Sequence, residues 1–375
     1  MDAPELSDWL RLLHTPDVGR ETARRLLAAF GAPGRVFEAE PAARRAVVGE
    51  TLAERLADPP PGLSALVETT LAWLAGGSDE SPRTILTLGD PDYPDALLQT
   101  ADPPVLLHAQ GHRRWLAGEL VAIVGSRKPT PEGLETARAF GAALAGAGCT
   151  VVSGMALGID GAAHEGALDA GGASIAVVGT GLDRVYPARH RALAHRLAAH
   201  GLILSEYPIG TAPLAGNFPQ RNRIIAGLSR GTLVVEAALQ SGSLISARLA
   251  AEAGREVFAV PGSIHAPQSR GCHALIKQGA KLVETVEDIL EELRPAAGRR
   301  AAAPPPVCRE GDDEPEEAPS DSLLEALGHA PVSLDALVAR TGMPVPALGA
   351  ALLELELAGR VARLPGQLFQ RIGQG

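Results

Sequence analysis

Residues 120–154 read LVAIVGSRKPTPEGLETARAFGAALAGAGCTVVSG, and this stretch decides the fold. The apolar run Leu120–Val124 ends at a glycine, and a second run, Thr150–Val152, ends at a Ser-Gly pair. Between the two runs, residues 136–147 read as a helix. Two short, continuously apolar strands joined by an amphipathic helix predict parallel neighbours in a sheet that is covered on both faces.

The same alternation continues to about residue 293. Further apolar runs predict strands at residues 174–178, 202–204, 233–235 and 257–260, and helical patterns lie at residues 161–170, 191–200 and 245–253. We therefore expect an α/β domain with a parallel sheet over residues 79–293. Ligands of such sheets bind beyond the carboxyl ends of the strands, which is where the candidate loops described below fall.

Residues 1–78 read as a separate helical domain. A first helix capped by Asp8, a turn at residues 15–19 and a helix Glu21–Phe30 closed by Gly31 are similar to a helix-hairpin-helix or sterile-alpha-motif-like unit. The hairpin amides of such units can hold a DNA phosphate, but Asp17 in the turn would repel one. A plain helical hairpin with a packing role is therefore the favoured interpretation.

Residues 294–320 predict a flexible linker, because three consecutive prolines and a run of acids cannot bury a core. Residues 321–375 predict a winged-helix-like domain of three helices and a small hairpin, with Ser333 capping the second helix. Its first helix turns three leucines inward: Leu323, Leu324 and Leu327. The third helix, Val345–Leu357, is the candidate reading helix for DNA. It carries two glutamates and no base, which favours a role other than DNA binding.

The net charge of −10 argues against nucleic acid as a partner of the whole chain, but the charge is unevenly distributed. Residues 121–231 hold ten Lys and Arg against seven Asp and Glu, whereas residues 309–320 hold one Arg against six acids. The central region is therefore mildly basic. The first residues show no signal-peptide pattern, and no uncharged apolar stretch is long enough to span a membrane. We expect a cytoplasmic protein.

No metal site and no cofactor are expected. The three cysteines form no CxxC pair and lie far apart in the sequence: Cys149, Cys272 and Cys308. Three histidines recur every five residues, which rotates them around a helix instead of lining one face: His190, His195 and His200. Neither G-x-G-x-x-G nor a Walker A loop follows the first strand, so dinucleotide or nucleoside-triphosphate chemistry is not indicated.

The loop after the first strand, residues 125–130, is a candidate phosphate site. Gly125 lets the backbone approach a ligand closely, and Ser126 and the free amides at the next helix N-terminus can bind phosphate oxygens. Arg127 adds a planar, permanently charged donor group. The alternative is a surface turn with two solvated bases.

A second loop, which begins at Ser153 and Gly154, contains three glycines and predicts another pocket lined by backbone. Asp160 fits as the N-cap of the following helix. His164 lies four residues later and could share a hydrogen bond with Asp160. A structural Asp–His contact is favoured over a metal pair, because this segment holds no third ligand.

Residues 217–228, NFPQRNRIIAGL, are the most informative candidate. Phe218 is one of six phenylalanines, and it stands beside Arg221, Asn222 and Arg223 in a proline-bearing loop. Proteins that bind single strands stack bases on aromatic rings and hold the backbone with arginines. The alternative is a core phenylalanine beside salt-bridged arginines. A Gly/Ser loop precedes the next predicted helix and would face the same rim of the sheet: Ser241, Gly242 and Ser243.

Seven strings in the central region resemble the DNA-processing protein A (DprA, or Smf) family. They lie in order between residues 121 and 262 and read GSR-x-x-T, SG-x-A-x-GID-x-x-AH, GLD-x-x-YP, SEYP-x-G, FP-x-RNRIIAGLS, VVEA…SGSL and VFAVPG. The resemblance covers the whole central domain and extends to residues 271–280. The two flanking domains fit the family more loosely.

The resemblance implies an extended Rossmann-like domain that binds and protects single-stranded DNA and loads the RecA recombinase during natural transformation. It also implies a homodimer formed through the late part of that domain. By match, DNA binding is carried onto Arg127, Phe218, Arg221 and Arg223. Contacts with the second subunit or with RecA are carried onto six residues of one stretch: Cys272, His273, Leu275, Ile276, Gln278 and Lys281.

Two other functions are left open. Residues 229–236, SRGTLVVE, partly resemble the PGG-x-GT-x-x-E motif of nucleotide hydrolases of the lysine-decarboxylase-like (LOG) type, which share this fold. The leading PGG is missing, Glu236 has no evident partner for activating water, and other hydrolase motifs are absent, so we expect no enzyme. A pure interaction module acting through the winged helix would explain the C-terminal domain but not the rim loops.

Overall fold

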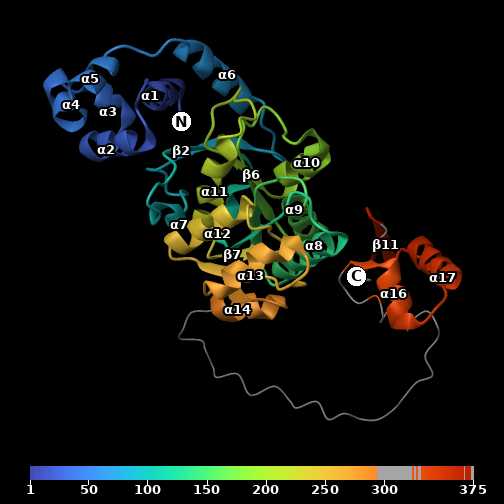
Figure 1. Cartoon of the computed structure of the whole chain (residues 1–375). Helices are drawn as coiled ribbons and strands as arrows, with labels where there is room; N and C mark the ends of the chain where they lie inside the picture. Colours follow the sequence, from blue (N-terminus) through green and yellow to red (C-terminus); the bar gives the residue numbers. More distant parts are fainter. Residues whose placement is uncertain (294–322, 325–326, 328–330, 367, 373–375) are drawn as a thin grey trace.

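One nine-stranded sheet forms the centre of the molecule (Figure 1). The computed structural model describes residues 1–293, 323–324, 327, 331–366 and 368–372. The strands run across the sheet in the order β1-β2-β6-β5-β4-β3-β7-β8-β9. In chain order they are β1 (Arg83–Thr87), β2 (Leu106–Gly111), β3 (Leu120–Val124), β4 (Thr150–Ser153), β5 (Ser174–Val178), β6 (Leu202–Ser205), β7 (Gly231–Val234), β8 (Glu256–Ala259) and β9 (Lys281–Leu282).

Strands β3 to β9 all pair in parallel, which confirms the predicted α/β fold class. Because β3 lies between β4 and β7, the strand order reverses at β3. Parallel α/β sheets bind ligands at such a switch point. Strands β1 and β2 extend the sheet in antiparallel fashion beyond β6. The sequence does not predict these two strands, because their apolar runs are short and lie among proline-rich turns.

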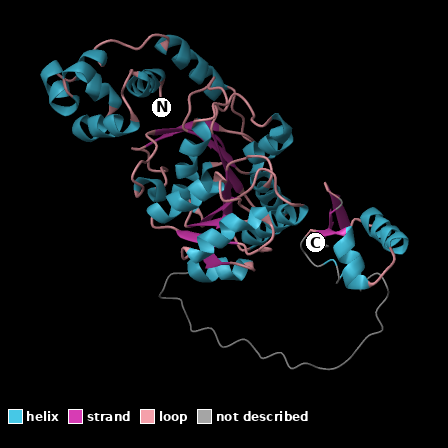
Figure 2. Cartoon of the chain, in the orientation of Figure 1, coloured by secondary structure: helices cyan, strands magenta, loops and turns pink. Residues whose placement is uncertain are grey.

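Helices cover both faces of the sheet (Figure 2). Successive residues of β3 point to opposite faces: Ala122 packs in a core with Ile224 of α11, and Ile123 packs in a second core with Ile159 of α9. Helices α11, α12 and α13 contribute to the first core, and α8, α9 and α14 to the second. The helices are α7 (Asp95–Leu98), α8 (Pro131–Gly146), α9 (Ile159–Asp169), α10 (Arg191–His200), α11 (Asn217–Leu228), α12 (Ser243–Glu252), α13 (Arg270–Lys277) and α14 (Val286–Leu293), with short 3-10 helices η1 (Arg113–Ala117), η2 (Ala188–His190) and η3 (Pro267–Ser269).

The structure corrects two local predictions on the rim of the sheet. Residues 217–228 form helix α11, not a loop. Pro219 fits there because it lies in the first helical turn, where its missing N–H removes no hydrogen bond. Asp160 does not cap α9. That position is taken by Gly158, whose positive φ of 85° suits a residue without a side chain.

Six helices precede the sheet: α1 (Ala3–His14), α2 (Arg20–Phe30), α3 (Pro33–Glu38), α4 (Pro41–Val48), α5 (Glu50–Arg55) and α6 (Leu63–Ala75). Asp2 caps α1, because its Oδ1 accepts the Glu5 amide at 2.9 Å, so the prediction that Asp8 caps this helix is wrong. Gly31 ends α2 as predicted. Leu6 and Leu26 share a core with Leu106 of β2, so the helical region packs on the antiparallel end of the sheet.

The C-terminal region has the predicted winged-helix form. It contains β10 (Val332–Ser333), α16 (Leu334–Thr341), α17 (Val345–Leu357), β11 (Val361–Leu364) and β12 (Leu368–Arg371). Ser333 caps α16, since its Oγ accepts the Ala336 amide at 3.2 Å. Leu323, Leu324 and Leu327 are buried in the core of this unit.

The predicted linker, residues 294–320, lies outside the described residues. The domain boundaries after residues 78, 293 and 320 stay predictions. In the part of the chain that the structure describes, every helix is too short or too polar to cross a lipid bilayer.

Candidate functional site

A cavity of about 560 Å³ opens at the carboxyl end of β3, at the switch point of the sheet. The loops after β3 and β7 and the first turns of α11 and α12 form its wall. It collects nine of the predicted site residues: Gly125, Ser126, Arg127, Phe218, Arg221, Asn222, Ser241, Gly242 and Ser243. Three predicted residues are not among its lining: Ser153, Gly154 and Arg223.

The loop after β3 is fixed by close backbone contacts. A Cβ at Gly125 would lie 2.7 Å from Ile159 Cγ1 and 3.0 Å from the Glu236 carbonyl, so only glycine fits there. The Ser126 carbonyl accepts the Ile159 amide at 3.2 Å, and Ser126 Oγ accepts the Lys128 amide at 3.1 Å. The loop is thereby attached to the start of α9, and the side chain of Arg127 extends from it into solvent.

Three side chains form a row beside the cavity. The Arg127 guanidinium lies over the ring of Phe218, with Cζ 5.6 Å from the ring centroid. Phe218 also lies near the Tyr186 ring, with centroids 5.5 Å apart and ring planes inclined by 39°. Tyr186 is 47% exposed. The sequence places Tyr186 only in the GLD-x-x-YP string, because nothing local shows that it meets a ring 32 residues later.

Arg221 is buried beneath the cavity, with only 4% of its surface exposed. Its guanidinium donates a hydrogen bond to the Val177 carbonyl. Burial lowers the pKa of Arg221 to about 10, and the nearby Asp160 carboxylate partly opposes that effect. Arg221 is therefore a buried positive charge under the site, and its assignment to DNA binding stays a prediction.

Ser153 and Gly154 support Arg221 from below. Ser153 Oγ donates to the Ile123 carbonyl at 2.6 Å and is fully buried. A side chain at Gly154 would collide with the Arg221 guanidinium, so this glycine makes room for the arginine. The expected pocket at this pair of residues is thus filled by a side chain of α11.

Asp160 and His164 hold the same loop separately and do not bond to each other as expected. Asp160 Oδ2 accepts the amides of Gly154 and Ala156 at 3.2 and 3.3 Å. His164 Nε2 accepts the Met155 amide at 3.3 Å, and its Nδ1 lies 2.7 Å from Ser174 Oγ. Both side chains have structural tasks.

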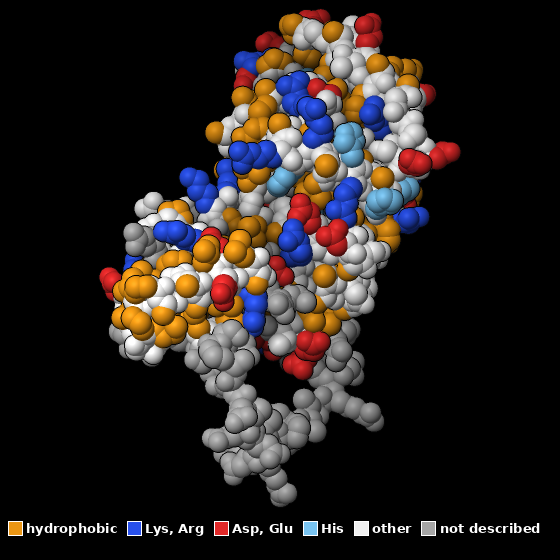
Figure 3. Space-filling model, turned by 90° about the vertical axis from the view of Figure 1, so that its right-hand side faces the viewer, with side chains coloured by type: hydrophobic (Ala, Val, Ile, Leu, Met, Phe, Trp, Pro, Cys, Tyr) orange, Lys and Arg blue, Asp and Glu red, His pale blue; other side chains and the backbone are white. Residues whose placement is uncertain are grey.

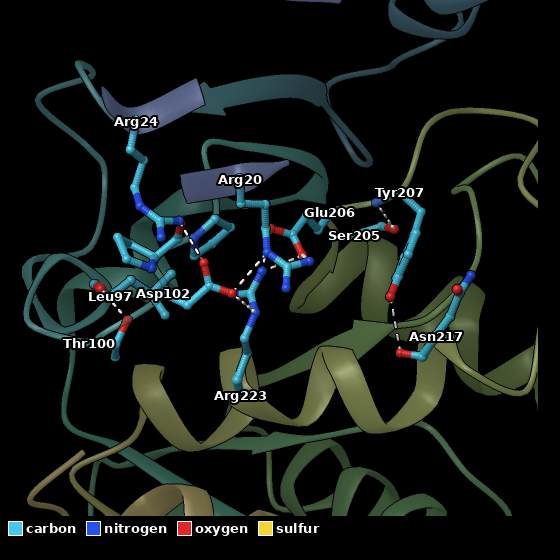
Figure 4. Close-up of polar contacts among 12 residues, drawn as sticks. Arg20, Arg24, Leu97, Thr100, Asp102, Ser205, Glu206, Tyr207, Asn217 and Arg223 are labelled. Atoms are coloured by element: carbon cyan, nitrogen blue, oxygen red, sulfur yellow. Dashed lines mark hydrogen bonds and ion pairs between the residues drawn. The ribbon is translucent and has the colours of Figure 1, made fainter. Parts of the chain in front are cut away.

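Arg223 points away from the cavity into a network of charges at the end of β6 (Figure 4). Its Nε lies 3.1 Å from Asp102 Oδ2, and its guanidinium also binds Glu206. Arg20 and Arg24 of α2 reach Asp102 from the other side at 2.8 and 2.6 Å. Arg223 therefore joins the helical region to the central sheet, which corrects its expected place in the binding site.

The predicted Gly/Ser loop forms the start of α12. Ser241 Oγ and Ser243 Oγ are hydrogen-bonded at 2.7 Å, and Ser241 Oγ also accepts the Ser243 amide at 3.3 Å. The next two amides of α12 are also bonded, that of Leu244 to the Ser241 carbonyl and that of Ile245 to the Gly242 carbonyl, each at 3.1 Å, and this N-terminus faces the cavity. The dipole of a helix favours an anion at this end.

The stretch 272–281 lies beside a second cavity of about 700 Å³, between α12 and α13. Cys272 is fully buried, with Sγ 3.6 Å from the carbonyls of Val234 and Val235, and burial raises its pKa to about 12. Cys272 therefore cannot contact a partner, which corrects that expectation. Lys281 is paired with Glu292 at 2.8 Å.

Five of the six predicted contact residues keep some exposed surface: His273, Leu275, Ile276, Gln278 and Lys281. Leu275 and Gln278 line the second cavity, and the His273 ring lies with Nε2 3.0 Å from the Gly262 carbonyl. The two cavities share one wall. Four residues at the start of α12 line both of them: Gln240, Ser241, Gly242 and Ile245.

Three family models match the chain. The DNA recombination-mediator protein A model matches residues 84–294, the DprA-like N-terminal HHH domain matches residues 4–54, and the DprA winged helix domain matches residues 301–367. The first match alone covers more than half of the sequence. The chain belongs to the DNA-processing protein A family.

Relatives in this family cover most of the chain. Protein Smf of Escherichia coli is 46% identical over 80% of this chain and 79% of its own length, and Protein Smf of Synechocystis is 35% identical over 98% and 99%. The crystal structure of DprA from Streptococcus pneumoniae superposes with a TM-score of 0.60, at 35% identity over 76% of this chain and 97% of that chain.

The description of a second solved structure of the family names single-stranded DNA binding. That protein is the DNA processing protein A of Helicobacter pylori, described for its single-stranded DNA binding mode, with a TM-score of 0.51 and 33% identity over 56% of this chain and 95% of that chain. The predicted family and fold class are thus confirmed, including the Rossmann-like central domain and the winged helix.

Proposed function

We propose that the chain binds single-stranded DNA at the switch-point cavity. The row of Arg127, Phe218 and Tyr186 is the observation that carries the proposal. Single-strand binding proteins stack bases on aromatic rings, which every base tolerates, and hold the backbone with cations. In this site Phe218 stacks a base and Arg127 binds a phosphate, while the dipole of α12, whose N-terminus faces the cavity, favours the same negative charge. The single-stranded DNA binding mode for which the Helicobacter pylori relative is described supports the proposed ligand.

Fluorescence anisotropy of a labelled oligo-dT tests the site. Removal of the ring in Phe218→Ala should weaken binding roughly 5- to 150-fold, the value of about 1–3 kcal/mol per stacked base. Phe218→Tyr keeps a ring and should restore most of the affinity. Arg138→Ala, an exposed arginine on α8, is the control for a general loss of positive charge. Equal binding by the wild type and Phe218→Ala would exclude the site.

We propose further that the protein is not an enzyme. Glu236, the residue that a LOG-type hydrolase would use, is held by Thr130. Its carboxylate accepts the Thr130 amide at 3.0 Å and the Thr130 hydroxyl at 2.6 Å, so it fixes the start of α8. Burial raises the pKa of Glu236, and the two hydrogen bonds from Thr130 oppose this rise. Assays for hydrolysis of nucleoside monophosphates should therefore give no turnover.

We propose that the protein forms a homodimer, protects incoming single strands and loads RecA on them during natural transformation. The second cavity supports this proposal, because an apolar groove with Leu275 and Gln278 on its wall suits a protein partner. Ala274→Arg would place a charge in this groove. We expect the variant to be monomeric in light scattering and to load RecA poorly, while it still binds a short oligo-dT. A dimeric Ala274→Arg protein that loads RecA normally would exclude the groove.

A further inference from the structure

A second group of cations lies next to the cavity, on the surface of η2 and α10. Four of its members are exposed and one is half-buried, and we call them the α10 surface: Arg184, Arg189, His190, Arg191 and His195. Figure 3 views the molecule from the side on which α10 lies in Figure 1, and Lys, Arg and His side chains gather over this face.

Two arginines of the α10 surface have no polar partner among the described residues. Within the described residues, the side chains of Arg189 and Arg191 make no hydrogen bond and no ion pair. The neighbouring cations differ, since Arg184 is paired with Asp183 at 3.0 Å and Arg196 with Asp169 at 2.6 Å. Exposed arginines without carboxylate partners are available to bind phosphate.

The α10 surface borders a cavity of about 460 Å³. Arg184, Arg191 and His195 line it together with apolar side chains, among them Leu182 and Val185. An apolar floor with cations on its edge suits a nucleotide, because the base and sugar can cover the floor while the phosphate meets the cations.

This basic cavity lies close to the Phe218 cavity. Tyr186, whose ring lies 5.5 Å from Phe218, is followed directly by η2 and α10. His190 Nδ1 lies 3.1 Å from the Met155 carbonyl. Met155 lines the basic cavity, and its neighbour Ala156 lines the Phe218 cavity. The turn at residues 186–190 therefore contacts one lining residue of each cavity, Phe218 through Tyr186 and Met155 through His190.

We infer that a single strand leaving the Phe218 cavity crosses Tyr186 and continues over the α10 surface. Tyr186 offers a second ring for stacking, and Arg189 and Arg191 bind the phosphates that follow. The inference rests on the proposed function, and it extends the DNA-binding site by a segment that a short oligonucleotide does not reach.

The test uses two lengths of oligo-dT, about 6 and about 20 nucleotides, within the range of single-strand site sizes. For Arg189→Ala/Arg191→Ala we expect about tenfold weaker binding of the long oligonucleotide and unchanged binding of the short one. For the long oligonucleotide, the slope of the logarithm of the binding constant against the logarithm of the salt concentration should become shallower by about 1.4. Tyr186→Ala should also weaken the long complex more than the short one. Arg138→Ala/Arg230→Ala removes the same number of positive charges elsewhere, from one exposed and one half-buried arginine, each paired with a glutamate, and is the control for charge alone.

Different failures are distinguishable in this design. If Phe218→Ala weakens both lengths but Arg189→Ala/Arg191→Ala weakens neither, the Phe218 site stands and the α10 extension is wrong. If the double variant weakens both lengths equally, the α10 surface is not a separate segment, and the inference is again wrong. If Phe218→Ala weakens neither length, the proposed function itself fails. Charge reversal, Arg189→Glu/Arg191→Glu, should enlarge the loss for the long oligonucleotide, and both double variants should melt like the wild type.

Discussion

Arg127 and the two arginines of helix α11, Arg221 and Arg223, lie in opposite environments, because the first is exposed and the other two are largely buried. Arg127 lies on an exposed loop, stacked on Phe218 beside the cavity. Arg223 is 14% exposed, and it meets Asp102 and Glu206 at the junction with the helical region. Arg221, two residues before it, is buried under the cavity floor. Of these three arginines only Arg127 is exposed and has no carboxylate partner among the described residues, which is why the proposed DNA site relies on it.

The largest effect is expected for Arg221, which should affect stability before binding. Arg221→Ala removes a cation that acts on the buried Asp160 carboxyl and leaves the Val177 carbonyl without its donor, and a buried acceptor without a partner costs about 1–3 kcal/mol. Urea unfolding measures the loss. A double variant with Asp160→Asn should lose less than the sum of the two single changes, because the carboxyl on which the arginine acts is gone. Strict additivity would show that the two groups do not interact.

A crossed pair of substitutions comes next. Arg127→Ala should weaken oligo-dT binding about tenfold, in line with the loss of one hydrogen-bonded charge, while the free energy of unfolding stays within about 0.5 kcal/mol of the wild type. Arg223→Ala should clearly lower the free energy of unfolding. Its affinity for oligo-dT, measured under conditions where the variant is folded, should be nearly unchanged. Anisotropy and urea unfolding on both variants provide the comparison. Equal loss of affinity in both would place Arg223 in the binding site after all.

The smallest effect concerns pH at the junction. Burial raises the pKa of Asp102, but Arg223, Arg24 and Arg20 outweigh it, so the net pKa is lowered. Because the pKa is lower in the folded state, the carboxylate contributes its full stabilisation at any pH above the ordinary pKa of an aspartate. This contribution is lost as the pH falls through the lowered pKa of the folded state. For this partly exposed group we expect about 1 kcal/mol. Asp102→Asn should remove both the stabilisation and this acid-dependent component of the unfolding curve. An unchanged acid limb in the variant would contradict the assignment.

The sequence predicts what depends on neighbouring residues and misses what depends on distant ones. The bounds of α10 and α17 follow from local apolar patterns, and the structure reproduces both. The parallel strands and the rim loops follow in the same way. Asp102 lies 121 residues before Arg223, and Arg221 occupies space that Gly154 leaves free, so no local pattern announces either contact. Tyr186 is missed as a partner of Phe218 for the same reason.

Sequence also shows its limit in helix α11. Arginines, asparagines and a proline in one stretch indicate a polar loop, yet Ile224, Ile225 and Leu228 anchor a helix on the sheet. Burial of these side chains outweighs the weak helix propensity of the first turn. The stretch therefore presents Phe218 at the start of a rigid element, where a loop would have left the ring mobile.

The wall shared by the two larger cavities has a thermodynamic consequence. Gln240, Ser241, Gly242 and Ile245 face both spaces, so a strand in one and a protein partner in the other would touch the same four residues. Linkage then makes the effect mutual: if a bound strand alters the affinity for the protein partner by some factor, the partner alters the affinity for the strand by the same factor. The start of α12 would contact both ligands, so that the binding of either one could change the affinity for the other.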